Sequence, residues 1–155
     1  MNNEKKNIVI TSALRTAIGS FRGSLKSMQG YELGSAVVSK VIEKSNLKPS
    51  DIDELIMGQV LTGSAGQNPA RQTAIRAGIP VEKTAYVINQ VCGSGLRSVA
   101  AAYQSINSED ASIVIAGGQE SMTNALHAVN FRNGQKLEEK NLIDMMIQDG
   151  LWDAF

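Results

Sequence analysis

Short apolar blocks alternate with amphipathic blocks along this chain, and the alternation predicts strands and helices in turn. Four blocks are rich in β-branched residues, which favours buried strands; they span residues 7–13, 55–61, 84–90 and 111–116. Three blocks have helical features and span residues 31–45, 68–77 and 93–106. Strands that alternate with helices are typical of parallel pairing through crossover helices. We therefore expect an α/β fold in which a layered, mixed and mostly parallel sheet carries helices on both faces.

Local signals support the helices and predict further elements. The first helix should bury one face, formed by Leu33, Val37, Val38, Val41 and Ile42. In the second, Asn68 is expected to cap the helix, and Pro69 fits its first turn. Ser50 followed by Asp53 resembles the start of a short capped helix. The residues at 136–149 are polar first and then apolar, and they predict one more helix.

Composition and charge narrow the possible functions. Apolar residues make up 43% of the 155 residues, as in ordinary globular domains, and the 15 basic side chains balance the 15 acidic ones. A formal charge of zero argues against nucleic acid or an anionic membrane as a partner. No apolar stretch is long enough for a signal peptide or a membrane span, and one cysteine cannot form an internal disulfide. These features are typical of a soluble cytoplasmic protein.

Reactive chemistry is concentrated around the only cysteine, Cys92. It lies between a predicted strand and a predicted helix, whose first turn has unpaired N–H groups and partial positive charge. A thiolate is stabilised there, and the same N–H groups can receive the oxyanion that forms when a thioester is attacked. Gly93 and Gly95 would let an acyl group approach the backbone closely. A small buried hydrophobe is an equally good interpretation of the cysteine, so these residues leave both open.

The segment Asn89-x-x-Cys92-Gly-Ser-Gly-Leu closely resembles the nucleophile segment of the thiolase family. Further segments match the family in the same order: residues 15–25 (RTAIGSFRGSL), 58–61 (GQVL), 66–72 (GQNPARQ), 117–122 (GGQESM) and 149–155 (DGLWDAF). The resemblance runs in register from residue 8 to residue 155. The form Cys-Gly-Ser-Gly is similar to the biosynthetic, short-chain branch, whereas degradative relatives tend to carry Cys-Ser-Ser-Gly.

The resemblance implies an acetyl-CoA C-acetyltransferase. In the family, the cysteine that matches Cys92 takes an acetyl group from acetyl-CoA and passes it to the carbanion of a second acetyl-CoA. The products are acetoacetyl-CoA and CoA, and the reverse reaction is thiolysis. These CoA thioesters are substrates, so the resemblance implies no cofactor and no metal. The Cys92 N–H is a candidate oxyanion donor, while Gly118 and Glu120 are expected to support the pocket, with a structural role for Glu120.

The family's other catalytic groups, a His, a second Cys and a Gly-rich loop, lie in its second half. His127 does not match the catalytic His. Residues 1–155 are therefore expected to form a thiolase N-terminal domain, truncated before the central loop region and the C-terminal domain. Little or no turnover is expected of it alone. The family forms dimers or tetramers, so the expected partner is a second copy or a complementing C-terminal half.

Two other functions remain open. One is a condensing enzyme of the β-ketoacyl synthase type. Such enzymes generally carry Ala and Ser beside the nucleophile, so the Cys-Gly-Ser-Gly segment of this chain argues against this alternative. A non-catalytic half-domain or split subunit that pairs with a second chain is also possible. The apolar residues Met145, Met146 and Ile147, and the apolar segment from Trp152 to Phe155, favour this second alternative.

Overall fold

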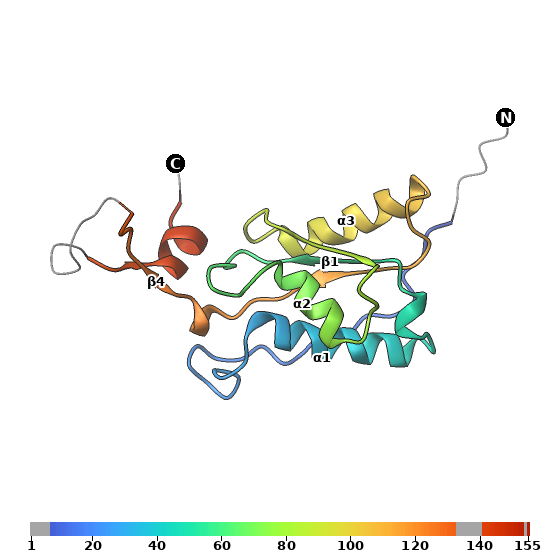
Figure 1. Ribbon diagram of the computed structural model, residues 1–155, viewed down its shortest axis with the longest axis horizontal. Coiled ribbons are helices and arrows are strands. Elements are labelled where there is room, and N and C mark those ends of the chain that lie inside the picture. Colours follow the sequence, from blue (N-terminus) through green and yellow to red (C-terminus); the bar gives the residue numbers. More distant parts are fainter. Residues whose placement is uncertain (1–6, 133–140, 154) are drawn as a thin grey trace.

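A three-stranded parallel sheet forms the centre of the computed structural model, which describes residues 7–132, 141–153 and 155 (Figure 1). The strands are β1 (Glu54–Gly58), β2 (Thr84–Ile88) and β3 (Val114–Gly118), in the order β2-β1-β3. The central strand β1 pairs in parallel with both neighbours, so that Ile56 lies opposite Tyr86 on one side and Ala116 on the other. The predicted parallel sheet is therefore present.

Within the described part of the chain, three α-helices cover this sheet: α1 (Gly30–Lys44), α2 (Pro69–Arg76) and α3 (Ser94–Asn107). One face carries α3, whereas α1 and α2 lie on the opposite face (Figure 1). Helices on both faces confirm the predicted α/β fold.

The main core lies between the sheet and the layer formed by α1 and α2. Alternate residues of a strand face opposite sides, so Leu55 and Met57 of β1 share one face. They belong to one buried cluster with Val38 and Ile42 of α1 and Ala74 of α2. Burying an aliphatic side chain of this size contributes about 1.5–3 kcal/mol. This cluster therefore fixes the α1–α2 layer against the strands that carry the site.

The predicted helix signals are mostly confirmed. The Asn68 side chain accepts a hydrogen bond from the backbone N–H of Arg71 at 3.1 Å, and Pro69 begins α2. Gly78 follows the end of α2 with a φ of +84°, a conformation that favours glycine. In α1 the fully buried residues are Gly30, Gly34, Val38 and Ile42, whereas Leu33, Val37 and Val41 are half-buried. The face of α1 that is buried is therefore rotated slightly from the predicted one.

The short helix predicted at Ser50 was wrong in its capping. A 3₁₀ turn spans Pro49–Asp51, and it is Asp51 that accepts a hydrogen bond from the Lys48 N–H, at 2.8 Å. Asp53 instead accepts from the backbone N–H groups of Ser112 and Ile113, at 2.9 and 3.1 Å. Because these N–H groups are bound by a side chain, β3 begins at Val114, three residues later than predicted.

The strand predicted at residues 7–13 is also wrong, because this segment is assigned to no strand. Val9 is 72% exposed and Ile10 is 78% exposed, so the apolar pattern did not lead to burial. The segment and β3 both line a hollow of about 480 Å³. Side chains of α1 and α3, among them Val37 and Tyr103, complete the lining.

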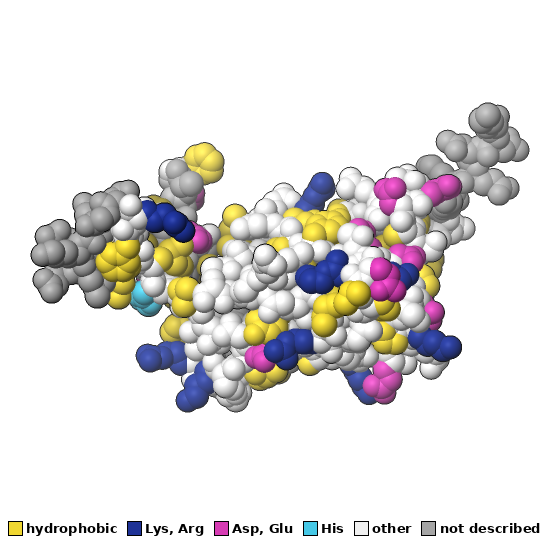
Figure 2. Space-filling model, viewed as in Figure 1, with side chains coloured by type: hydrophobic (Ala, Val, Ile, Leu, Met, Phe, Trp, Pro, Cys, Tyr) yellow, Lys and Arg dark blue, Asp and Glu magenta, His cyan; other side chains and the backbone are white. Residues whose placement is uncertain are grey.

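The segments after β3 form a small unit that protrudes from the sheet (Figure 1). A 3₁₀ turn (η2, Met122–Asn124) leads to the antiparallel pair β4 (His127–Ala128) and β5 (Ile143–Asp144), followed by a π-helical turn (η4, Met146–Leu151). Figure 2 shows hydrophobic side chains gathered on this unit.

The helix predicted at 136–149 is only partly testable. Residues 136–140 lie outside the described residues, the helix is wrong for residues 141–144, and residues 145–149 are helical as predicted. The Met145 N–H donates to the Leu126 carbonyl at 3.0 Å, and the Asp144 carboxylate accepts from the Met146 N–H at 2.9 Å. These bonds fix an extended segment up to Asp144, and the backbone becomes helical from Met145. Among the described residues, no helix has the length and apolar character that crossing a membrane requires.

Candidate active site around Cys92

A tight corner places Cys92 between β2, which ends at Ile88, and α3, which begins at Ser94. Val91 has a φ of +48°, an unusual conformation for a β-branched residue. Local hydrogen bonds hold this corner: the Ser94 hydroxyl accepts from the Gln90 N–H at 2.8 Å and donates to the Val91 carbonyl at 2.6 Å. Cys92 is exposed at this turn, two residues before α3, so the predicted strand–helix corner is present and the alternative of a buried hydrophobe is wrong.

Glycines let the first turn of α3 lie directly on the ends of two strands. A Cβ at Gly58, the last residue of β1, would overlap the backbone carbonyl carbon of Ser94 and lie 2.5 Å from the Gly95 nitrogen. A Cβ at Gly118, the last residue of β3, would lie 3.3 Å from the Gly95 Cα. Gly95 was predicted to give an acyl group access to the backbone. Its backbone also packs against the ends of β1 and β3, and this contact fixes the position of the Cys92 corner relative to the sheet.

Cys92 opens onto a cavity of about 410 Å³ at the carboxyl ends of the strands. The lining is mainly apolar and small, and it includes Gly58, Leu61, Val91, Gly95, Met122 and Leu151. Glu120 contributes a carboxylate to this lining. In the part of the chain that the structure describes, no partner is found for the backbone N–H of Cys92. A thiol beside a mainly apolar cavity and a free N–H is a suitable arrangement for accepting an acyl group.

Glu120 is held within the cavity wall by backbone groups. Its carboxylate accepts from the Val60 N–H at 2.8 Å and from the Leu61 N–H at 3.2 Å. Burial raises the pKa of Glu120 above its usual value, while hydrogen bonds from the N–H groups of Val60, Leu61 and Ser121 oppose the rise. These contacts agree with the structural role predicted for Glu120, although its effect on any reaction stays a prediction.

Two buried glutamines, which the sequence analysis missed, extend this wall toward the helices. Gln59 and Gln119 are 3% and 7% exposed, and the Gln119 amide nitrogen donates to the Gln59 oxygen at 2.9 Å. Thr73 of α2 donates to the Gln119 oxygen at 2.7 Å. A Cβ at Gly34 of α1 would overlap that same oxygen. Their position just after β1 and β3, within the family-like segments GQVL and GGQESM, is the signal in the sequence that could have indicated them.

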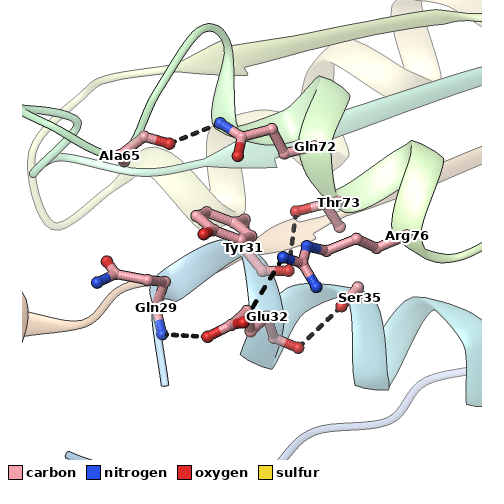
Figure 3. A network of polar contacts seen from close by, with 8 residues as sticks. All are labelled: Gln29, Tyr31, Glu32, Ser35, Ala65, Gln72, Thr73 and Arg76. Carbon is pink, nitrogen blue, oxygen red and sulfur yellow. Dashed lines mark hydrogen bonds and ion pairs between the residues drawn. The ribbon is translucent and has the colours of Figure 1, made fainter. Parts of the chain in front are cut away.

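Figure 3 shows how α1 and α2 are joined around Thr73. The Thr73 hydroxyl also lies 3.4 Å from the Tyr31 carbonyl, while Arg76 lies over the Tyr31 ring at 5.0 Å. Arg76 approaches the Glu32 carboxylate at 3.7 Å, and Glu32 accepts from the Gln29 N–H at 2.9 Å. Through Thr73, this network connects the buried glutamines to the first turn of α1 and to the later part of α2.

His127 lies in β4 and is not among the residues that line the Cys92 cavity. Its Nε2 lies 3.7 Å from the Asp144 carboxylate, on the opposing strand β5. Within the described ranges, no group of three or more His, Cys, Asp and Glu side chains is suited to hold a metal ion. The titratable groups that the structure brings to the cavity lining are therefore Cys92 and Glu120.

Comparison with known proteins identifies the family of this chain. Residues 8–155 match the family model described as "Thiolase, N-terminal domain". An acetyl-CoA acetyltransferase of Paracoccus denitrificans is 54% identical over 147 residues, which cover 95% of this chain and 38% of the relative. An acetyl-CoA acetyltransferase of Rhizobium meliloti is 50% identical over 149 residues, with 96% and 38% covered.

A solved structure shares the fold as well. The Acat5 thiolase of Ascaris suum, crystallised in complex with coenzyme A, matches with a TM-score of 0.87 and 38% identity over 91% of this chain and 37% of that chain. The chain thus spans well under half the length of the relatives it matches. Because the family match extends over nearly all of its residues, this chain belongs to the thiolase family.

Proposed function

We propose that Cys92 is the acyl-carrying nucleophile of a thiolase-type acetyltransferase that condenses two acetyl-CoA molecules to acetoacetyl-CoA and CoA. The observation that carries this proposal is the placement of an exposed thiol at a strand–helix corner, open to a mainly apolar cavity. The relatives named acetyl-CoA acetyltransferase support the substrate, and the CoA complex of the Ascaris thiolase supports CoA thioesters as the substrate class.

In the first half-reaction, the Cys92 sulfur attacks the thioester carbonyl, and a new carbon–sulfur bond forms as the bond to the CoA sulfur breaks. The proton of the Cys92 thiol ends on the departing CoA. The Cys92 N–H is placed to donate to the transient oxyanion. In the second half-reaction, an acetyl-CoA that has lost a methyl proton attacks the acetyl group, and the Cys92 thiolate leaves.

This chemistry needs groups that remove and return protons, and the described part of the cavity lining offers only Glu120 beside Cys92. The family resemblance locates a catalytic His and a second Cys in the second half of the protein. We therefore propose that activity requires the part of the relatives that this chain does not span. That part is expected either in the same polypeptide or in a complementing C-terminal half, within a homo-oligomer as the family forms.

The experiment measures CoA release from acetyl-CoA by the 155-residue chain alone, and by the whole protein that carries it. We expect negligible release by the chain alone, and turnover by the whole protein that Cys92→Ala abolishes. Full turnover by the isolated chain would contradict the need for the remaining groups. Undiminished turnover in the Cys92→Ala variant would refute the role of Cys92.

A further inference from the structure

The loop after β1 is held by side chains at the point where it lines the Cys92 cavity. The Leu61 N–H donates to the Glu120 carboxylate at 3.2 Å, and the Leu61 carbonyl accepts from the Gln59 amide at 2.9 Å. The preceding N–H, that of Val60, donates to the same carboxylate at 2.8 Å. Both backbone polar groups of Leu61 are therefore bound by partly or fully buried side chains, which leaves this residue little freedom to move.

The partners of Leu61 are themselves fixed. Gln59 is 3% exposed, and its oxygen accepts from Gln119, which in turn is bound by Thr73 of α2. Glu120 follows Gln119 directly, and the Gln119 N–H donates to the Gly58 carbonyl at 2.9 Å. Because buried polar groups are costly to leave without partners, this chain of bonds transmits the rigidity of the sheet to the loop.

The Leu61 side chain continues the wall on its outer side. A Cβ built at Gly150 would lie 3.5 Å from the Leu61 Cδ2, so the side chain rests against the π-helical turn η4. Leu61, Gly150 and Leu151 all line the cavity onto which Cys92 opens. The position of Leu61 therefore sets the position of one wall, which is built from two segments some 90 residues apart in sequence.

We infer that Glu120 is a positioning residue for acyl transfer, acting through Leu61. With Gln59, it holds Leu61 so that its side chain and the turn at Gly150 form the apolar wall that receives the acyl group of the CoA thioester. Glu120 itself exchanges no proton with the substrate. This inference rests on the acyl transfer proposed for Cys92 and adds the residue that shapes its acyl subsite.

The test compares Glu120→Ala and Glu120→Gln with Glu32→Ala in the whole protein that carries this chain. Glu32 is a matched control because its carboxylate also accepts a backbone N–H, that of Gln29 at 2.9 Å, but it does not line the cavity. Steady-state kinetics with acetyl-CoA report on the wall. Alkylation of Cys92 by iodoacetamide reports on the thiol alone, because this small reagent needs no acyl subsite.

We expect Glu120→Ala to raise KM for acetyl-CoA by about tenfold, with a smaller effect on kcat, because a pre-formed binding wall is lost. Its alkylation rate should stay within about twofold of wild type. Glu120→Gln keeps one acceptor oxygen and should recover part of the loss, and Glu32→Ala should behave as wild type. Equal kinetics for Glu120→Ala and Glu32→Ala would overturn the inference.

Amide hydrogen exchange at residues 60–61 tests, independently of catalysis, whether the Glu120 carboxylate holds the backbone of this loop. Faster exchange in both Glu120 variants than in Glu32→Ala supports this role of Glu120, whereas equal exchange refutes it. If the wild-type protein transfers no acetyl group, the function proposed for Cys92 fails, and the exchange measurement still decides whether Glu120 holds Leu61.

Discussion

Replacing Gly58 with alanine perturbs the contact that seats α3, and Cys92 with it, on the sheet. The added Cβ would overlap the Ser94 carbonyl carbon, and it would lie 2.5 Å from the Gly95 nitrogen and 2.7 Å from the Ser94 oxygen. All three are backbone atoms, so no side chain can rotate away. The first turn of α3 must move, and the Cys92 corner must move with it.

The size of the effect follows from this geometry. Adding a methyl group to a well-packed core costs about 1–3 kcal/mol, and a backbone obstacle places Gly58→Ala near 3 kcal/mol. For a chain of this size, each kcal/mol lowers the melting temperature by roughly 2–4 °C, so the expected fall is about 6–12 °C. The displaced corner should also change the rate at which Cys92 is alkylated.

Urea unfolding followed by circular dichroism measures this effect, with Gly63→Ala as the matched control. A Cβ at Gly63 meets nothing within 4 Å, so the same chemical change should be nearly neutral there. If the free energies of unfolding of the two variants agree within about 0.5 kcal/mol, the seating of α3 on Gly58 is refuted.

Three further substitutions test other contacts. Hydrogen bonds from two backbone N–H groups, and to a smaller extent from Lys83, hold the pKa of Asp53 below its usual 3.8, so the stability that this carboxylate contributes is lost as pH falls through its folded-state pKa. Asp53→Asn should therefore make the urea midpoint depend less on pH in the acid range, and an unchanged dependence would contradict this. Burial raises the pKa of Glu120 above 4.5, so the contribution of Glu120 to stability declines as pH rises from 4.5 through the folded-state pKa. Glu120→Gln should remove this decline from the plot of urea midpoint against pH, and a decline that persists in the variant would rule out Glu120 as its source. Asn68→Ala removes the cap of α2 and should lower the free energy of unfolding by about 1 kcal/mol in urea titration, whereas no loss would show that the cap is unimportant.

The fold could be predicted from the sequence where local signals and burial agree. β1 and β2, α1, α2 and α3 were placed within a few residues because apolar periodicity and the Asn68 cap indicated the same elements. The start of β3 could not be predicted, because it depends on Asp53, some 60 residues earlier, binding the backbone N–H groups of Ser112 and Ile113.

Two other elements show the limit of pattern alone. Residues 7–13 have a strand-like sequence, but a strand needs a neighbour to bond with, and among the described residues no strand pairs with this segment. At residues 143–144 the predicted helix is replaced by β5, because these residues pair with β4 and the adjacent Met145 N–H donates to the Leu126 carbonyl, contacts between residues that are not neighbours in sequence.

The strand–helix corner that carries Cys92 was predictable, whereas the residues that support it were not. Cys92 has strand residues before it and glycines around it, so its corner could be read from sequence. Gln59 and Gln119 are polar residues of a type that is mostly exposed, and only the close approach of the strand ends makes them partners. The contact that needs Gly58 likewise depends on how α3 crosses the sheet.

The acyl-carrying role of Cys92 is tested most directly by mass spectrometry of the whole protein that carries this chain, after brief exposure to acetyl-CoA and acid quenching. We expect one acetyl group on the peptide that contains Cys92, its removal when free CoA is added, and no label in Cys92→Ser. Acetoacetyl-CoA formation that continues without any acetyl group on Cys92, or in the Cys92→Ser variant, would contradict this role.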